Sequence, residues 1–232
     1  MRRMDPVKPT EVDLLAVDLL IGLEKFSAAR HIVLGGYFAL KHYCDYRATH
    51  DVGAWWSRDA GEAERQAVRV ALQSVLAGVA HRRGLALNRR QFGDTEFWEF
   101  KQGGTKIFSF QIASRTLQLE AYLPSPWPPL QIEGLSDNVA SKMNALVQRG
   151  APRDFVDVRQ LTMRGLATAI ECWDLWQRKN PDLKLADAQA EAARHLQALE
   201  LRRPLDSIAE PAEHRRAAET RDWFRTHFLP GS

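Results

Sequence analysis

The chain has 232 residues, of which 45% are hydrophobic and 26% are charged, and its formal net charge at pH 7 is +3. These values are ordinary for a globular protein that buries a sizeable core. No run approaches the roughly 20 apolar residues of a membrane-spanning helix, and the segment MRRMDPVKPTEVD lacks the apolar core of a signal peptide. We therefore expect a cytoplasmic protein with no membrane contact. Its two cysteines, Cys44 and Cys172, are far apart in the sequence, which argues against a zinc cage or a disulfide framework.

The first half of the chain predicts a mixture of helices and strands. Apolar residues at helical spacing run from Val12 to Phe26, after Thr10, which can cap a helix. The following elements are a buried strand with a glycine turn in HIVLGG (31–36), a helix in YFALKHYC (37–44) and a strand in THDVGAWW (49–56). The order is therefore strand, turn, helix, strand.

The pattern then changes twice along the chain. Residues 59–81 are amphipathic and helical, with Gly84 as a stop signal, and residues 85–123 consist of short segments typical of antiparallel hairpins. A proline-rich connector at 124–129 cannot hold a regular helix. Helices are predicted at 136–149, 153–162, 164–179, 184–200 and 207–228. We expect an α+β protein, with an α/β domain at 1–130 and a helical part at 131–232.

The Gly-Gly turn is a candidate phosphate-binding site. Gly35 and Gly36 connect a strand to a helix, so backbone N–H groups point at whatever lies above the turn, although any sharp turn can use glycine. Asp51 lies on the next strand, and the alternation of strand side chains places residue 53 on the same side of it. Two acids there would hold Mg²⁺, but residue 53 is glycine and leaves a partial site. Glu120 could supply a carboxylate from an adjacent strand, or could simply face solvent.

A second candidate lies in SDNVASKMNALVQRGAPRDFVDVRQL (136–161). Lys142 lies at the margin of the apolar stripe of the first helix, so its ammonium group could reach a neighbouring cleft. Asp154 and Asp157 share a face of the second helix, which we expect to lie opposite the stripe of Phe155 and Val158. A lysine, an arginine and two carboxylates could bind a triphosphate, although the same acids also suit an ordinary helix start.

These two blocks resemble the AbiEii/AbiGii-type nucleotidyltransferases, a family that includes toxins of bacterial toxin–antitoxin and phage-defence systems. HIVLGGYFALKHYCDYRATHDVGAWW (31–56) is similar to the family pattern of strand, Gly-Gly, helix and Arg-x-Ser/Thr-x-Asp-x-Asp. The later block is similar to Asp-x-x-x-x-Lys followed by Arg/Lys-Asp-x-x-Asp. Together they span residues 30–162, more than half of the chain.

The resemblance implies a nucleotidyltransferase fold that uses Mg²⁺ to transfer a nucleoside monophosphate from an NTP to an acceptor, which is RNA such as tRNA or a protein. It also implies a cognate antitoxin as a possible partner. The implied catalytic residues are Asp51, Lys142, Asp154 and Asp157, and the implied metal ligands are Asp51 and Glu120. The implied nucleotide-binding residues are Gly35, Gly36, Tyr37, Arg47, Lys142 and Arg153.

Two positions depart from the family pattern. Tyr37 stands where a serine or threonine is common, and Gly53 replaces the second aspartate of the metal pair. Since metal electrostatics supply most of the catalysis in phosphoryl transfer, we expect activity to be lost or greatly reduced. The alternative is a catalytically degenerate member that acts as a nucleotide-binding or protein-interaction module. Trp173 and Trp176 are expected to pack a helix against the core.

Overall fold

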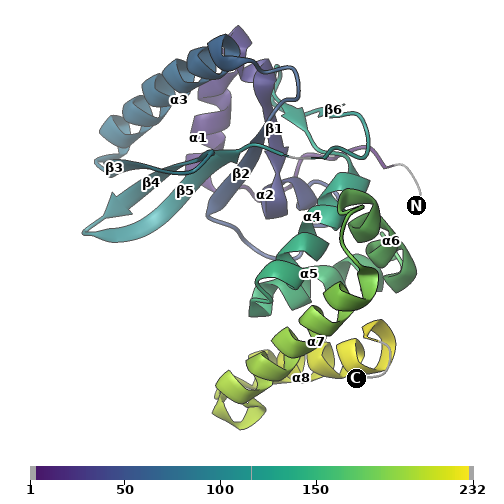
Figure 1. Ribbon diagram of the computed structural model, residues 1–232. Helices are drawn as coiled ribbons and strands as arrows, with labels where there is room; N and C mark the ends of the chain where they lie inside the picture. Colours follow the sequence, from purple (N-terminus) through teal and green to yellow (C-terminus); the bar gives the residue numbers. More distant parts are fainter. Residues whose placement is uncertain (1–3, 116, 230–232) are drawn as a thin grey trace. The chain divides into compact units, whose positions relative to one another are not determined.

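The computed structural model describes residues 4–115 and 117–229 and divides the chain into two compact units (Figure 1). The first unit comprises the described residues 4–138 and the second comprises 139–229. The boundary lies inside helix α4 (Leu135–Gln148), eight residues after the end of the α/β domain expected at residue 130. The fold class is α+β, as predicted, with a mixed sheet followed by helices.

The first unit is built on a seven-stranded sheet of order β3-β4-β5-β2-β1-β7-β6. The pairs β2–β5 and β1–β7 are parallel, and the other neighbours are antiparallel. The strands are β1 (Ile32–Gly35), β2 (Asp51–Trp56), β3 (Ala86–Phe92), β4 (Thr95–Gln102), β5 (Thr105–Ala113), β6 (Leu123–Pro124) and β7 (Gln131–Ile132). The helices are α1 (Leu14–Leu23), α2 (Gly36–Leu40) and α3 (Glu62–Arg83), with a short 3-10 helix at Ser27–His31.

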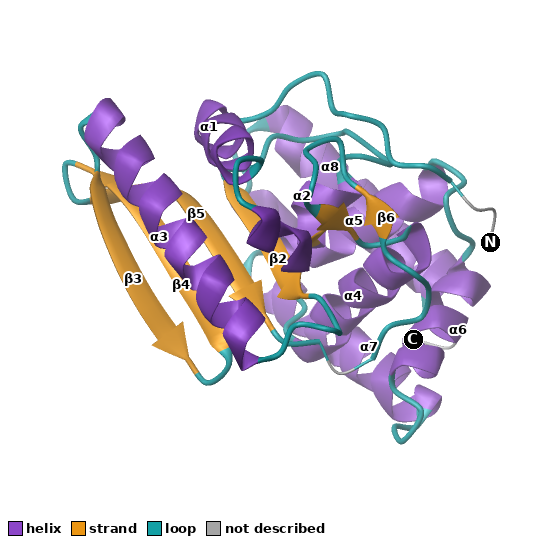
Figure 2. Ribbon diagram, turned by 90° about the horizontal axis from the view of Figure 1, so that it is seen from above, coloured by secondary structure: helices purple, strands orange, loops and turns teal. Residues whose placement is uncertain are grey.

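Helices α1 and α3 cover one face of this sheet, and α3 runs across β3, β4 and β5 (Figure 2). The buried side chains of both helices form one hydrophobic cluster with the inward-facing residues of the strands, such as Trp98 and Phe110. Strand β2 alternates between the two faces as predicted, with Val52, Ala54 and Trp56 in the core. Asp51, Gly53 and Trp55 therefore lie on the opposite face of the sheet.

Two predicted elements of the first unit differ from the structure. The first helix begins after Asp13, whose Oδ1 accepts a hydrogen bond from the N–H of Leu15 at 2.8 Å, and Thr10 does not cap it. The segment RTLQLEAYL (115–123), in which residue 116 lies outside the described residues, was predicted to be a strand and forms a loop up to β6. The backbone N–H groups of Leu119 and Glu120 donate to the carboxylate of Asp137 instead of to a neighbouring strand.

The second unit is helical, as predicted. Its helices are the greater part of α4, then α5 (Pro152–Met163), α6 (Ala169–Lys179), α7 (Leu185–Arg202) and α8 (Pro211–Trp223), followed by a π-helical turn at Phe224–Phe228. Trp173 and Trp176 are buried, which confirms their predicted packing role. Gly150 ends the turn between α4 and α5 with a φ of +52°, and a Cβ at this position would lie 2.8 Å from Cδ2 of His195.

No helix among the described residues is both long enough and apolar enough to cross a membrane.

Candidate functional site

The Gly-Gly turn of the first unit is held by a buried carboxylate. Gly36 has a φ of +63°, a conformation that favours glycine, and its N–H donates to Oε1 of Glu133 at 3.0 Å. Asn138 donates to the carbonyl of Gly36 at 2.8 Å and also to Oε1 of Glu133. The backbone N–H that we expected to contact a phosphate therefore has a carboxylate partner in this structure.

Glu133 is the centre of a wider polar network on the face of the sheet opposite the core helices. Its Oε2 accepts hydrogen bonds from Nε1 of Trp55 at 3.0 Å and from Arg115. The guanidinium of Arg115 also lies 3.1 Å from Asp137 and 4.9 Å from the ring centroid of Trp55. Glu133 and Asp137 are fully buried, and buried charges require such pairing. Sequence reasoning missed this network, because its members come from a strand, a helix and loops that are far apart in the sequence, and their pairing carries no spacing signal.

Asp51 stands at the edge of this face, at the start of β2. Its carboxylate accepts a hydrogen bond from Ser109 of β5, and Nζ of Lys106 lies 3.2 Å from Oδ1. The side chain of Asp51 is 46% exposed, so water also reaches it. Asp51 therefore has a lysine and a hydroxyl as neighbours, which stabilise its charged form.

Gly53 lies between two other strands at the position where the second acid of a metal pair is expected. It is paired with Gly35 in β1 and with Gln111 in β5. A Cβ at position 53 would meet the carbonyl of Gly35 at 3.5 Å and Nε2 of Gln111 at 3.6 Å, which are ordinary contacts. Gln111 is thus the residue of β5 that faces this position, and it is an amide. Within residues 4–115 and 117–229, no group of three or more His, Cys, Asp or Glu side chains forms a metal-binding cluster.

The carboxylate of Glu120 lies at the N-terminus of α4. Its Oε1 accepts a hydrogen bond from the N–H of Ser136 at 2.8 Å, which satisfies one of the free donors of the helix start. Gly134 makes room for it, because a Cβ there would lie 2.7 Å from Cγ of Glu120. Glu120 thus acts as a helix cap, a role that its predicted strand position could not reveal.

Tyr37 and Arg47 form a packed pair beside the Gly-Gly turn. The hydroxyl of Tyr37 donates to the carbonyl of Arg47 at 3.0 Å and accepts from its N–H at 2.9 Å. The guanidinium of Arg47 lies over the ring of Tyr37, 3.4 Å from the centroid. Burial raises the pKa of Tyr37, so the phenol stays protonated at neutral pH.

In the second unit, the turn from α4 to α5 brings together two acid–base pairs. Nζ of Lys142 lies 2.7 Å from Oδ2 of Asp157. Arg149 binds Asp154 with two parallel hydrogen bonds of 2.8 and 2.6 Å, and these bonds raise the pKa of Arg149. Asp154 also accepts a hydrogen bond from the N–H of Ala151 at 3.0 Å and so caps α5.

One expectation about this turn is wrong. Asp154 and Asp157 were expected on the face of α5 opposite Phe155 and Val158, but all of these side chains are buried. The acids can be buried because each has a basic partner and, for Asp154, a backbone donor. Arg153, the predicted nucleotide contact, is exposed, and the arginine that pairs with Asp154 is Arg149.

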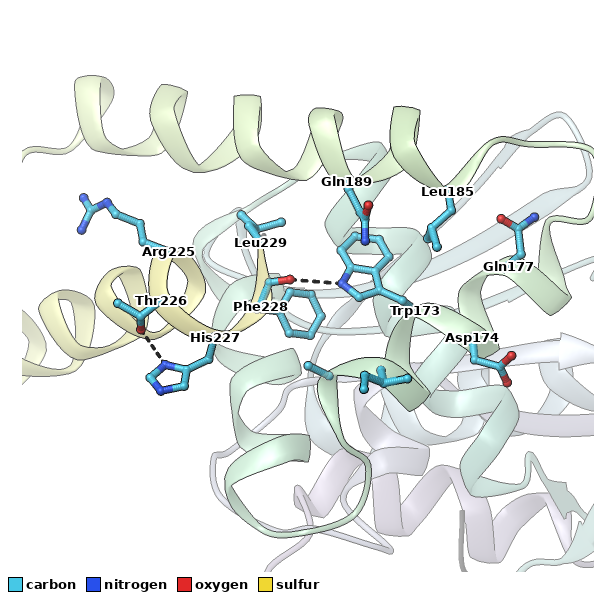
Figure 3. A pocket seen from close by; sticks show the side chains of 12 residues that line it. Trp173, Asp174, Gln177, Leu185, Gln189, Arg225, Thr226, His227, Phe228 and Leu229 are labelled. Carbon is cyan, nitrogen blue, oxygen red and sulfur yellow. Dashed lines mark hydrogen bonds between the residues drawn. The ribbon is translucent and has the colours of Figure 1, made fainter. Parts of the chain in front are cut away.

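The second unit also contains a cavity of about 580 Å³ between α6, α7 and the π-helical turn (Figure 3). Trp173 forms part of its wall and donates from Nε1 to the carbonyl of Phe228 at 3.3 Å. Leu185 and Leu229 contribute further apolar surface. None of the predicted site residues lines this cavity.

Comparison with known proteins gives a limited result. No family model matches the chain, and no curated protein matches it. Among solved structures, a polyadenylate synthase of Megavirus is similar over 96% of this chain and 52% of its own, with 8% sequence identity and a TM-score of 0.37. The chain thus spans about half the length of that protein.

Proposed function

We propose that the protein is a nucleotidyltransferase-fold protein of the toxin and phage-defence type, which binds an NTP with Mg²⁺ and in which nucleotide transfer is strongly impaired. The proposed acceptor of the nucleotide is RNA such as tRNA, or a protein. We propose a cognate antitoxin as the protein partner. Two motif blocks support this proposal, together with the order β1, Gly-Gly turn, α2, β2 in the first unit.

The observation that carries the proposal is the register around Gly53. Asp51 and Gly53 share one face of β2, and Gln111 faces Gly53 from β5. In this class of reaction, Mg²⁺ neutralises charge on the attacking and leaving oxygens, and carboxylates must bridge the ions. Asp51 alone provides one carboxylate. A single carboxylate still suits an Mg²⁺ ion that is held mainly by the phosphates of the NTP and by water.

With Asp51 as its single carboxylate, the proposed site therefore favours binding of the nucleotide over catalysis of its transfer. In the second unit, Asp157 holds the ammonium of Lys142 in one orientation, which suits a role as a point charge for phosphate. We propose Arg47, Tyr37 and Arg153 as further nucleotide contacts, and Gly35 and Gly36 as the backbone on which the phosphates rest. Asp154 caps α5 and so positions the start of the helix that carries Arg153, and it has no proposed contact with the reacting atoms.

Restoring the missing acid tests the proposal. Gly53→Asp is sterically allowed, because the new Cβ would meet only ordinary contacts, and Gly53→Asn is a control of the same size without charge. We expect transfer of labelled nucleotide to tRNA or protein by Gly53→Asp, and more by Gly53→Asp with Gln111→Glu, at least about 100-fold above the parent and the Asn control. A parent protein that transfers nucleotide as fast as Gly53→Asp would overturn the impaired-enzyme proposal.

A second candidate function is a protein-interaction module that binds no nucleotide. It is favoured by Glu133, whose carboxylate already occupies the N–H of Gly36 and would repel a phosphate there. Isothermal titration separates the two. If an NTP with Mg²⁺ gives heat in the parent and none in folded Lys142→Ala, the nucleotide-binding function stands. If no NTP gives heat in the folded parent, the interaction module is the better function.

A further inference from the structure

A second polar cavity lies in the first unit, at the far end of β2 from Asp51. It has a volume of about 180 Å³ and is lined by side chains that follow the carboxyl ends of β2 and β5 and by the first turn of α3. Its polar lining includes Ser57, Arg58, Arg65, Ser114, Arg115 and Tyr122. Strands β2 and β5 are parallel neighbours, and ligands of open α/β sheets bind outside the carboxyl ends of such strands.

The charged side chains that line this cavity are all arginines, and the carboxylate of Asp59 lies close by, hydrogen-bonded to Ser57. Three arginines line it, and no aspartate or glutamate belongs to its described lining. Arg115 is balanced by Glu133 and Asp137 behind it. The guanidinium groups of Arg58 and Arg65 therefore have no acidic partner among the described residues of the lining.

Arg65 is held in place by neutral groups alone. Its Nε donates to the carbonyl of Ala60 at 3.1 Å, its Nη1 donates to Oγ of Ser114 at 3.4 Å, and its guanidinium lies 5.5 Å from the ring centroid of Trp56. Arg58 is exposed, and the described part of the chain offers it no hydrogen bond or ion pair. The nearest acid in sequence, Asp59, is 77% exposed and lies 3.7 Å from Nδ1 of His31.

The neutral groups of the lining are donors that suit an anion. The hydroxyl of Ser114 accepts a hydrogen bond from Arg65 and keeps its own proton to donate. The buried hydroxyl of Ser57 already has His31 and Asp59 as partners. Burial raises the pKa of Tyr122, so its phenol keeps its proton and can donate. Guanidinium groups bind phosphate oxygens with paired hydrogen bonds, which adds geometric specificity to the charge. The volume is below the roughly 300 Å³ at which pockets for whole small molecules begin.

We infer that this cavity is a binding site for a phosphate group, held by Arg58 and Arg65 and by the hydroxyl of Ser114. The phosphate comes from free inorganic phosphate or from the terminal phosphate of a nucleotide. The inference does not depend on the nucleotide contacts proposed for Asp51 in the first unit and Lys142 in the second, because neither residue lines this cavity.

The test is titration calorimetry of the full chain in Lys142→Ala, so that the proposed nucleotide site does not contribute. Sodium phosphate and AMP are the probes, at low ionic strength because exposed charges are screened by salt. Arg58→Gln and Arg65→Gln are compared with Arg82→Gln, an exposed arginine in the last turn of the same helix α3 that removes the same charge. Arg58→Gln removes no internal hydrogen bond, so it keeps the test valid if Arg65→Gln fails to fold.

We expect each cavity variant to weaken phosphate binding by about tenfold or more, and Arg82→Gln to leave it unchanged. Tighter binding of AMP than of phosphate, with the same loss in Arg58→Gln, identifies a nucleotide as the source; equal binding identifies free phosphate. The inference is overturned if neither probe binds, or if Arg58→Gln and Arg82→Gln bind phosphate equally well.

Discussion

The Gly-Gly turn of the first unit and the α4–α5 turn of the second unit use buried carboxylates in different ways. In the second, each acid of the motif also stabilises the fold: Asp157 pairs with Lys142, and Asp154 caps α5 and binds Arg149. In the first, the buried acid that holds the turn is Glu133, which lies outside the motif. Asp51 is half-exposed, and a Cβ at Gly53 would meet only ordinary contacts, with Gly35 and Gln111.

Because the two turns differ in this way, the residues of a motif can be retained for stability even where the protein has no activity. The acids of the α4–α5 turn form buried pairs and a helix cap, contacts that stabilise the fold whether or not the protein catalyses a reaction. The position of Gly53 carries no such structural demand, so an acid there can be lost without unfolding the sheet. Under the proposed function, the pairs of the second block bear on stability, and Asp51 and Gly53 bear on the chemistry.

The largest expected effect comes from removing Asp157. Asp157→Ala leaves the largely buried ammonium of Lys142 without that carboxylate, and breaking a buried pair from one side costs about 3–5 kcal/mol. Urea unfolding measures this loss. The double variant Lys142→Met with Asp157→Leu removes both charges and should recover most of the stability. A loss below about 1 kcal/mol in Asp157→Ala would show that the pair is structurally unimportant.

The next effect is a pH dependence of the first unit. His42 is buried, its Nδ1 hydrogen-bonds to the carbonyl of Phe38 at 2.8 Å, and burial lowers its pKa to about 4. The unfolded chain, with a pKa near 6.5, takes up the proton first, so stability is full above about pH 6.5 and falls as pH drops towards 4. The loss amounts to about 3 kcal/mol at its limit.

Urea unfolding at pH 7 and at pH 4.5 checks this dependence. Replacing His42 with Gln should flatten the profile in this range, whereas His81→Gln, which changes an exposed histidine of the same unit, should leave it unchanged. Hydrogen exchange of peptides from residues 4–138 should show the acid-induced loss of protection. An unaltered profile in His42→Gln would mean that other groups produce the dependence.

The sequence predicted the elements whose signal is local. The alternation of β2 placed Asp51 and residue 53 on one face, and apolar spacing with glycine and proline signals gave the helices of the second unit. The apolar stripe predicted for α4 is buried in the structure, where Val139, Met143 and Leu146 are fully buried. Periodicity is sufficient for such features because each residue's environment depends on its close neighbours along the chain.

Contacts between distant segments could not be predicted. The pairing of β2 with β5, which brings Gln111 to Gly53 and Ser109 to Asp51, depends on sheet register. The segment around Glu120 has strand-like alternation. However, the N–H of Glu120 donates to Asp137, and its carboxylate accepts from the N–H of Ser136 and so caps α4. Asp154 and Asp157 were misplaced because a carboxylate can be buried when it has a basic partner, and the apolar pattern does not reveal that partner.

The smallest expected effect compares the two glycines that face each other across β1 and β2. In Gly35→Ala, the new Cβ would overlap the indole of Trp55, with Cδ1 only 2.7 Å away, although the backbone φ of −143° suits any residue. The indole must move and its hydrogen bond to Glu133 must weaken, so we expect a loss of about 1–3 kcal/mol. In Gly53→Ala the new contacts are 3.5 Å or longer, and the change in stability should stay within about 0.5 kcal/mol.

Thermal and urea unfolding of both variants decides between two explanations of position 53. If Gly53→Ala is as destabilising as Gly35→Ala, packing on β1 requires a glycine there and the absence of an acid has a structural cause. If only Gly35→Ala is destabilising, the fold accepts a side chain at position 53. Under the proposed function, the absence of a carboxylate at position 53 then concerns chemistry alone, and any transfer gained by Gly53→Asp can be attributed to the introduced charge.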